Sequence, residues 1–197
     1  MAGQIVDEQY FHDIANAIRN KNGESTLYKP KEMALAISNI ESGMPSTSID
    51  FLNKTVTNFT STVTLVKEYA FYKFASLVSI SLPNATRVSK YAFRYCTSLA
   101  NVNVPSLTTI DDSGFMQCSL ISITLPSIAS IGNSAFEVCS ELTTITLPGS
   151  TVCTLGTRAF TNTSITNIYV PAELVDTYKA ATNWSSYASK ISAIPNE

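Results

Sequence analysis

The 197-residue sequence contains a single histidine, His12, and few of the groups that catalysis needs. A nucleophilic serine or cysteine needs a base that a third group orients, and no histidine follows residue 12. A second histidine that would share a metal ion with His12 is missing, and neither a phosphate-binding loop nor a dinucleotide-binding glycine pattern occurs. The sequence therefore predicts a protein that is not an enzyme and uses no cofactor or metal. We interpret His12 as a surface or oligomer-interface residue.

Charge is sparse and nearly balanced. The sequence has 13 Lys and Arg against 15 Asp and Glu, a formal net charge of -2. Nucleic acids and anionic membranes attract clustered basic residues, so we expect neither partner. No apolar run reaches the roughly 18 residues of a spanning helix, which predicts no membrane insertion. The first residues lack the basic and apolar regions of a signal peptide. We therefore expect no general secretory export unless a leader has been removed.

The sequence does contain an internal repeat, and a repeat of fixed length indicates a repeat architecture for the fold. Each copy holds an alternating apolar and polar segment that ends in proline. Five copies occur, at residues 77–83, 99–105, 120–126, 142–148 and 165–171. They begin 22, 21, 22 and 23 residues apart. The alternation predicts a strand with one buried face, and the proline ends the strand because it has no N–H to donate.

A second element of the repeat lies between these strands. A small residue followed by phenylalanine occurs five times, as Ala70-Phe71, Ala92-Phe93, Gly114-Phe115, Ala135-Phe136 and Ala159-Phe160. We expect a short turn of α- or 3₁₀-helix here, with the phenylalanine in the core. One unit cannot bury its own apolar face, so neighbouring units must stack. The sequence therefore predicts an α/β solenoid of about five coils of about 22 residues, with parallel strands along one side.

The unit at residues 131–148 resembles the BspA-like leucine-rich repeat family, and the resemblance covers roughly residues 60–171. The copies differ at one position, where the first unit has Phe74, the last has Thr163 and the middle three have cysteine. That family occurs on bacterial surfaces and in host-interacting proteins. The resemblance therefore implies binding to a ligand or to a cell surface.

The segments on either side of the repeats predict two caps. Residues 51–171 form the solenoid with its N-terminal cap, which we expect to contain a strand around residues 49–64. Residues 172–197 form a C-terminal cap, since a helical pattern follows Pro171. We interpret Trp184 as a buried residue of this cap rather than as a ligand-stacking residue. Residues 44–50 are interpreted as a linker.

Residues 1–43 do not follow the repeat and predict two short helices. Their apolar faces carry Phe11, Ile14, Ile18, Met33, Ile37 and Ile40. Helices this short bury little alone, so we expect these faces to mediate attachment or oligomerisation. Residues 14–23 and 28–37 resemble a helical segment of tail and fibre proteins of phages that infect Gram-positive bacteria. That resemblance implies virion tail proteins as partners and a homo-oligomer, with a trimer favoured.

The candidate ligand-binding residues lie on the outward side of the predicted strands. They form an uncharged polar strip of Ser79, Ser81, Asn101, Asn103, Ser122, Thr124, Thr144, Thr146, Asn167 and Tyr169. Hydroxyl and amide groups suit hydrogen bonding to a glycan or to an extended protein surface. Alternatively, they only keep an exposed sheet soluble. Tyr169 together with Tyr72, Tyr91 and Tyr95 is a candidate set of aromatic anchors.

Two further patterns are interpreted as structural. Cys96, Cys118 and Cys139 each follow a phenylalanine by three residues, which predicts a ladder of free, buried thiols rather than a disulfide framework. The pair Asp111-Asp112 is interpreted as a solvated turn rather than a calcium site, because oxygen ligands at calcium-loop spacing are lacking.

Three functions are consistent with the sequence. The first is a phage or prophage tail component that presents the solenoid to a glycan or protein on the host cell surface, and is therefore located in the virion. The second is a BspA-like adhesin on a bacterial cell surface. The third is a structural protein in which the repeats are a spacer and the N-terminal helices direct assembly.

Overall fold

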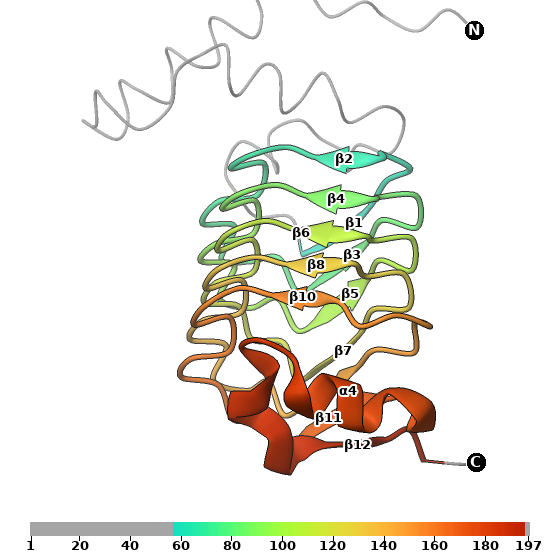
Figure 1. The fold of residues 1–197 in the computed structure, drawn as a ribbon. Helices are drawn as coiled ribbons and strands as arrows, with labels where there is room; N and C mark the ends of the chain where they lie inside the picture. The colour runs from blue at the N-terminus through green and yellow to red at the C-terminus, as the bar shows by residue number, and fades with distance from the viewer. Residues whose placement is uncertain (1–56, 196–197) are drawn as a thin grey trace, which may run out of the picture. The chain divides into compact units, whose positions relative to one another are not determined.

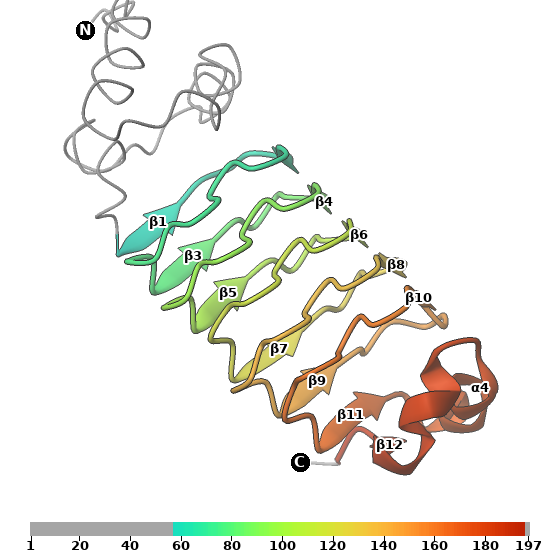
Figure 2. The same cartoon turned by 90° about the vertical axis from the view of Figure 1, so that its left-hand side faces the viewer.

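The computed structural model describes residues 57–195, which form a stack of parallel coils (Figure 1). One side of the stack carries the longer strands, which follow one another from coil to coil (Figure 2). They are β1 (Asn58–Thr60), β3 (Ser79–Ser81), β5 (Asn101–Asn103), β7 (Ser122–Thr124), β9 (Thr144–Thr146) and β11 (Asn167–Val170). The strands predicted between residues 77 and 171 are thereby confirmed. The predicted helices of residues 1–43, their six apolar residues and the linker lie outside the described residues.

The longer strands form two parallel sheets, ordered β1-β3-β5 and β12-β11-β9-β7, where β12 (Ile191–Ala193) is a strand near the C-terminal end. The register places Ile80 beside Val102 in the first sheet and Ile145 beside Ile168 in the second. Backbone pairing is interrupted between β5 and β7, where the repeat is 21 residues long. We attribute the interruption to the loop entering β7, which has one residue between Cys118 and Leu120 where the other middle copies have two.

A third sheet, which the sequence did not predict, follows a different side of the stack (Figures 1 and 2). Its two-residue strands are β2 (Leu65–Val66), β4 (Arg87–Val88), β6 (Thr109–Ile110), β8 (Ser130–Ile131) and β10 (Thr154–Leu155). The second residue of each strand is a buried aliphatic, and the first is exposed or half-buried. The expectation of strands along one side only was therefore wrong. Two residues are too few to show alternation in a sequence.

The segments that contain the small residue and phenylalanine are tight turns, so the expected turn of helix was wrong. In the first coil, the N–H of Ala70 donates to the carbonyl of Lys67, and that of Phe74 to the carbonyl of Phe71. The third residues of these two turns, Tyr69 and Lys73, have φ of 58° and 60°, whereas a right-handed helix needs φ near about -60°. The same pair of positive φ values recurs at Tyr91, Tyr95, Ser113, Gln117, Ser134, Val138, Arg158 and Asn162.

Hydrogen bonding between coils explains why turns replace the helix. The Phe71 N–H donates to the Ala92 carbonyl of the next coil at 2.8 Å, and the Phe93 N–H donates to Gly114 at 2.8 Å. In a helix these N–H groups would bond to carbonyls four residues earlier in the same segment. Here they join successive coils instead, so the turns add a third line of backbone hydrogen bonds to the stack.

The phenylalanines form a continuous row through the core. Ring centroids of Phe71 and Phe93 lie 5.0 Å apart, and those of Phe93 and Phe115 lie 4.9 Å apart. The row continues through Phe136 to Phe160. Full burial of one such side chain contributes on the order of 1.5–3 kcal/mol. Most of each coil's stabilising contact is therefore made with its neighbours.

The predicted thiol ladder is confirmed, since all four cysteines are free and buried. The Cys96 Sγ–H donates to the Phe71 carbonyl of the preceding coil at 3.0 Å, and Cys139 donates to Phe115 at 3.0 Å. Burial raises the pKa of the Cys139 thiol to about 12. It also raises the pKa of Cys118 well above its usual value. The Cys118 and Cys139 thiols are therefore neutral at physiological pH.

Residues 172–195, where the sequence predicts a C-terminal cap, follow the last long strand. They contain the 3₁₀-helices η1 (Ala172–Leu174) and η2 (Trp184–Lys190), the helix α4 (Val175–Ala180) and the strand β12 (Ile191–Ala193), which pairs with β11. Trp184 is fully buried, and its Nε1–H donates to the Cys153 carbonyl at 2.8 Å. Its ring lies 5.9 Å from that of Phe160 and so extends the phenylalanine row.

At the other end, β1 confirms the N-terminal strand for residues 58–60 of the expected range. The Phe59 ring is buried and meets Phe71 edge-on at 5.1 Å. In the described part of the chain, no helix has the length and apolar character needed to cross a membrane.

Candidate binding surfaces

The structure places all ten residues of the predicted polar strip on the outer side of the longer strands. Each is exposed or half-buried. The central residues between them, such as Ile80 and Ile145, point inward and are buried. Val102 of β5 is only half-buried, at the coil where strand pairing is interrupted. The predicted placement is therefore correct, whereas ligand binding by these residues stays a prediction.

In-register pairing aligns these residues in columns. Ser79 lies beside Asn58 and Asn101, and the Ser79 hydroxyl donates to Asn58 Oδ1 at 2.6 Å. In the neighbouring column, Asn103 Nδ2 donates to Ser81 Oγ at 3.0 Å. Parallel strands lie about 4.8 Å apart, so each column repeats its polar group at that interval. In this first sheet the side chains hydrogen-bond partly to one another.

The second part of the strip differs in this respect. Thr124 lies beside Thr146, which in turn lies beside Tyr169. Within residues 57–195, the hydroxyls of Thr124, Thr144 and Thr146 make no hydrogen bond to another protein group. They therefore present donors and acceptors to solvent or to a ligand. The interruption at β5 and β7 thus separates an internally bonded patch from one with unused hydrogen-bonding groups.

Sequence reasoning missed the residues that extend these columns. Asn58 and Thr60 of β1 continue them at one end, and Ser192 of β12 lies beside Tyr169 at the other. Asn58-Phe59-Thr60 shows the same alternation as the later copies, but Ser61 and Thr62 follow it where the others have an aliphatic residue and proline. The alternation of polar and apolar residues was therefore the sequence feature that could have placed β1 in line with the later strands.

A cluster of tyrosines lies on the turns of the first two coils. Tyr69 stacks on Tyr91 at 5.1 Å and meets Tyr72 edge-on at 5.5 Å, and Tyr72 meets Tyr95 at 5.7 Å. The structure therefore brings together three of the four predicted anchors and adds Tyr69. Tyr169, the fourth, lies on β11 among the strip residues instead. Partial burial, and then the nearby Glu68 carboxylate, raises the pKa of Tyr69, so its phenol is neutral at physiological pH.

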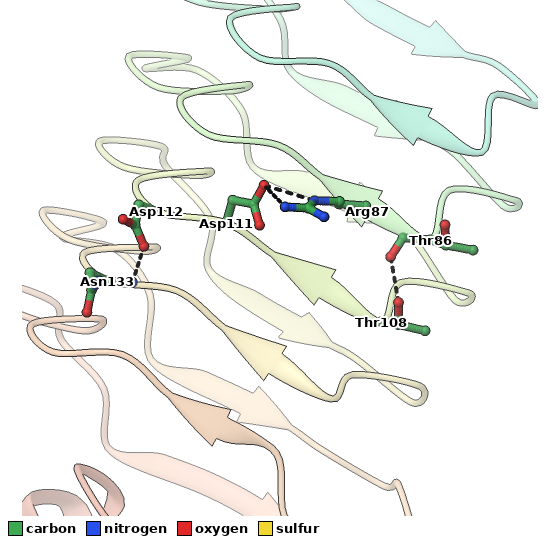
Figure 3. A network of polar contacts seen from close by, with 6 residues as sticks. All are labelled: Thr86, Arg87, Thr108, Asp111, Asp112 and Asn133. Atoms are coloured by element: carbon green, nitrogen blue, oxygen red, sulfur yellow. Dashed lines mark hydrogen bonds and ion pairs between the residues drawn. The ribbon is translucent and has the colours of Figure 1, made fainter.

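Asp111 and Asp112 serve structural contacts at the turn after β6 (Figure 3). Arg87 Nη2 lies 2.9 Å from the Asp111 carboxylate, and Asp112 Oδ1 accepts the N–H of Asn133 at 2.8 Å. Thr108 Oγ1 donates to the Thr86 carbonyl at 2.9 Å on the same side. In the part of the chain that the structure describes, no group of three or more His, Cys, Asp or Glu residues is placed to hold a metal ion. The ion pair and the hydrogen bond place both aspartates in contacts between neighbouring coils.

Stacked coils with a polar outer face and a closing cap define a solenoid repeat protein, a class that uses extended surfaces for binding. The chain belongs to the BspA type leucine rich repeat family, whose pattern matches residues 64–188 in six copies. The sequence pattern found five of these copies because it ended at Pro171. The match continues into the cap, where Trp184 extends the phenylalanine row and β12 supplies the strand.

The solved structures that are similar to this chain include two leucine rich repeat proteins. A leucine rich repeat protein of T. pallidum is 28% identical with a TM-score of 0.56, over 62% of this chain and 62% of that protein. A leucine rich cell surface protein of Faecalibacterium prausnitzii A2-165 is 31% identical with a TM-score of 0.53, over 59% of this chain and 32% of that protein. The chain thus spans less than two thirds of either. No curated protein matches it.

The family and these neighbours support a binding or adhesion role. Leucine-rich repeat solenoids are typically non-enzymatic scaffolds that bind other molecules. The question that follows is which surface binds, and what.

Proposed function

We propose that this protein is a non-enzymatic component of a phage or prophage tail that presents its solenoid to the surface of the host cell. The observation that carries the binding role is the second part of the strip, where Thr124 is in register with Thr146 and Ser122 with Thr144, and the three threonines have unused hydroxyls. A regular array of neutral donors and acceptors suits a repeating, extended ligand, because each strand offers the same groups at the same interval. A host glycan or an extended protein segment has this form.

The tail assignment rests on the N-terminal segments 14–23 and 28–37, which resemble phage tail and fibre proteins. Their apolar residues are proposed to bind virion tail proteins and to join copies of the chain, with a trimer favoured. Light scattering on the full chain and on a chain lacking residues 1–43 tests this. A trimer that becomes a monomer supports the proposal, and monomers in both cases contradict it.

A double substitution tests the binding surface. Thr124→Ala with Thr146→Ala removes two aligned hydroxyls from the strip. Thr109→Ala with Ser130→Ala removes two hydroxyl groups from the sheet of two-residue strands and is the matched control. Flow cytometry of the labelled full chain on host cells should show weaker binding for the strip variant alone. Equal binding by both variants would mean that the strip is a soluble sheet surface and not the binding site.

A bacterial cell-surface adhesin is the second candidate, and the similarity to the Faecalibacterium cell surface protein favours it. Immunogold electron microscopy with antibody to the repeats separates the two candidates. Gold at the tail tips of particles from the producing culture supports the tail component. Gold on cell envelopes, with none on particles, contradicts it and supports the adhesin.

A further inference from the structure

The first two coils carry a charge that the rest of the solenoid does not. Residues 57–99 contain five Lys and Arg and a single acidic residue, Glu68. Residues 100–195 contain three Lys and Arg and six Asp and Glu. Residues 57–99 thus have a net positive charge and residues 100–195 a net negative charge, although the sequence as a whole is nearly neutral. Four tyrosines lie in the same two coils as the basic residues.

Basic side chains are interleaved with these tyrosines. The Arg94 guanidinium lies 4.8 Å from the Tyr95 ring centroid and 5.2 Å from that of Tyr91. Lys90 lies 5.0 Å from Tyr91, and Lys73 lies 5.5 Å from Tyr72. Cation–π contacts hold a cation at the surface without neutralising it. We call Tyr69, Tyr72, Lys73, Lys90, Tyr91, Arg94 and Tyr95 the tyrosine–cation patch.

No ion pair of residues 57–195 neutralises the positive charge of this patch. The ion pairs there join Arg87 to Asp111 and Arg158 to Glu137, so Lys73, Lys90 and Arg94 pair with no carboxylate of the described residues. The Glu68 carboxylate acts on Tyr69 instead. Arg94 Nη2 donates to the Tyr95 hydroxyl at 3.2 Å, which is a neutral partner. An anion that binds here would therefore meet three cations that have no ion-pair partner among residues 57–195.

The fold does not require tyrosine at these turn positions. Tyr69, Tyr91 and Tyr95 have φ of 58°, 59° and 66°, a conformation that costs most L-residues about 1–2 kcal/mol and that asparagine tolerates best. In the last coil the position equivalent to Tyr95 is occupied by Asn162, whose φ is 58°. The turn geometry therefore does not explain the tyrosine rings, and we attribute them to a role of the surface. Tyr69, 45% exposed, is among the most exposed large hydrophobic side chains of the described residues.

We propose that the tyrosine–cation patch binds a short stretch of an acidic polysaccharide that carries carboxylate groups. Sugar rings would pack against the exposed tyrosine, and sugar carboxylates would pair with Lys73, Lys90 and Arg94. This inference rests on the proposed role in cell-surface binding and adds a second ligand chemistry to it. The strip on the strands would contact neutral groups, and the patch on the turns would contact acidic sugars.

The size of the patch favours a polysaccharide over other partners. A stable protein–protein interface uses roughly 20–30 residues on each side, and this patch has seven. Proteins that bind nucleic acid firmly make about 6–10 phosphate contacts, whereas three cations lie in the patch and the whole chain has a net charge of -2. A few acidic sugars match both the area and the charge.

Binding of a fluorescent tetragalacturonate to the full chain tests this inference. Anisotropy should show saturable binding that weakens between about 0.02 and 0.5 M salt, because charge pairs at a surface are screened. Neutral galactotetraose should bind about tenfold more weakly or worse. Lys73→Gln with Lys90→Gln, and separately Tyr69→Asn, should each weaken tetragalacturonate binding about tenfold. Lys179→Gln with Lys190→Gln in the cap is the matched control and should leave it unchanged.

Several outcomes would overturn the inference. These are no saturable binding by the wild-type chain, equal binding of galactotetraose, or an equal loss in the cap control. Tighter binding of a single-stranded DNA tetranucleotide or of tetraglutamate would assign the patch to nucleic acid or to an acidic peptide. If wild-type and patch variants bind host cells equally well, the inference fails while the proposed cell-surface role stands. If gold labels no particles but tetragalacturonate binds, the tail assignment fails alone.

Discussion

The first two coils, residues 57–99, and the end of the stack, residues 142–195, share the same inward residues but differ on their surfaces. Both bury a phenylalanine of the row and an aliphatic residue from each short strand. The first coils place tyrosines and cations on their turns, whereas the last coil places Arg158 and Asn162 at the corresponding positions of positive φ. Stacking therefore constrains the inward positions, and the outward positions are free to diverge between coils.

The ends also differ in how the stack closes. At the start, β1 supplies one strand and Phe59 covers Phe71. At the end, a 3₁₀-helix, a short helix and β12 bury Trp184 and Tyr178 against the last coil. The Tyr178 hydroxyl accepts the N–H of Cys153 at 3.2 Å, and burial raises its pKa. The C-terminal end is thus closed by specific polar contacts as well as by packing.

The largest expected effect is at this cap. Trp184→Ala removes a fully buried ring and leaves the Cys153 carbonyl without its donor. The free energy of unfolding should therefore fall by about 3–5 kcal/mol. Coils of a solenoid contact only their neighbours. Hydrogen exchange should therefore accelerate at β9 to β12 and change less at β3. Uniform acceleration along the chain would show that the two ends unfold together.

A smaller loss is expected where two late coils approach closely. A Cβ at Gly156 would lie 2.4 Å from the Asn133 nitrogen and 2.5 Å from the Gly132 carbonyl carbon, so Gly156→Ala must push the backbones apart. We expect a loss of about 1–3 kcal/mol in urea unfolding. Gly149→Ala is the control, because its nearest neighbour, the Pro126 oxygen, is 3.1 Å away. Equal losses would argue against close coil contact as the cause.

Alkaline pH should weaken the middle coils, which alone carry the thiol ladder. The pKa of Cys139 is raised from 9.0 to about 12 in the folded chain. The neutral thiol's contribution to the free energy of unfolding is therefore complete below pH 9. It is lost as pH rises towards 12, at about 1.4 kcal/mol per pH unit. Thermal melts should show that the Tm falls less between pH 7 and about pH 10 for Cys139→Val than for the wild type. An identical fall would exclude this thiol as the source.

The smallest effect concerns the turn position shared by both ends. Tyr95→Asn relieves a positive φ but loses contact with Tyr72 and Arg94, so its effect on stability should stay within about 1 kcal/mol. The reverse exchange, Asn162→Tyr, adds the same backbone cost without these partners and should destabilise by about 1 kcal/mol. Urea unfolding of both variants measures the difference. A stabilised Asn162→Tyr variant would contradict the argument.

Much of the solenoid was predictable because its signals are local. The alternation in residues 77–83 and its copies shows which residues of a strand are buried, and the recurrence of Cys96, Cys118 and Cys139 predicts the ladder. The sheet of short strands, β2 to β10, was not predicted because each of its strands has only two residues. The tight turns were not predicted because their positions of positive φ hold residues such as Tyr69 and Lys73 rather than glycine.

The sequence by itself determined the repeat, the inward residues and the outward placement of the polar strip, because each follows from spacing within about 22 residues. The tertiary structure decided which outward side chains meet. Tyr69 and Tyr91 become neighbours because the coils stack in register, and Tyr169 is placed with the strip because it lies on a strand. Contacts between coils depend on register and turn geometry. Those arise from hydrogen bonds between segments that are distant in the sequence.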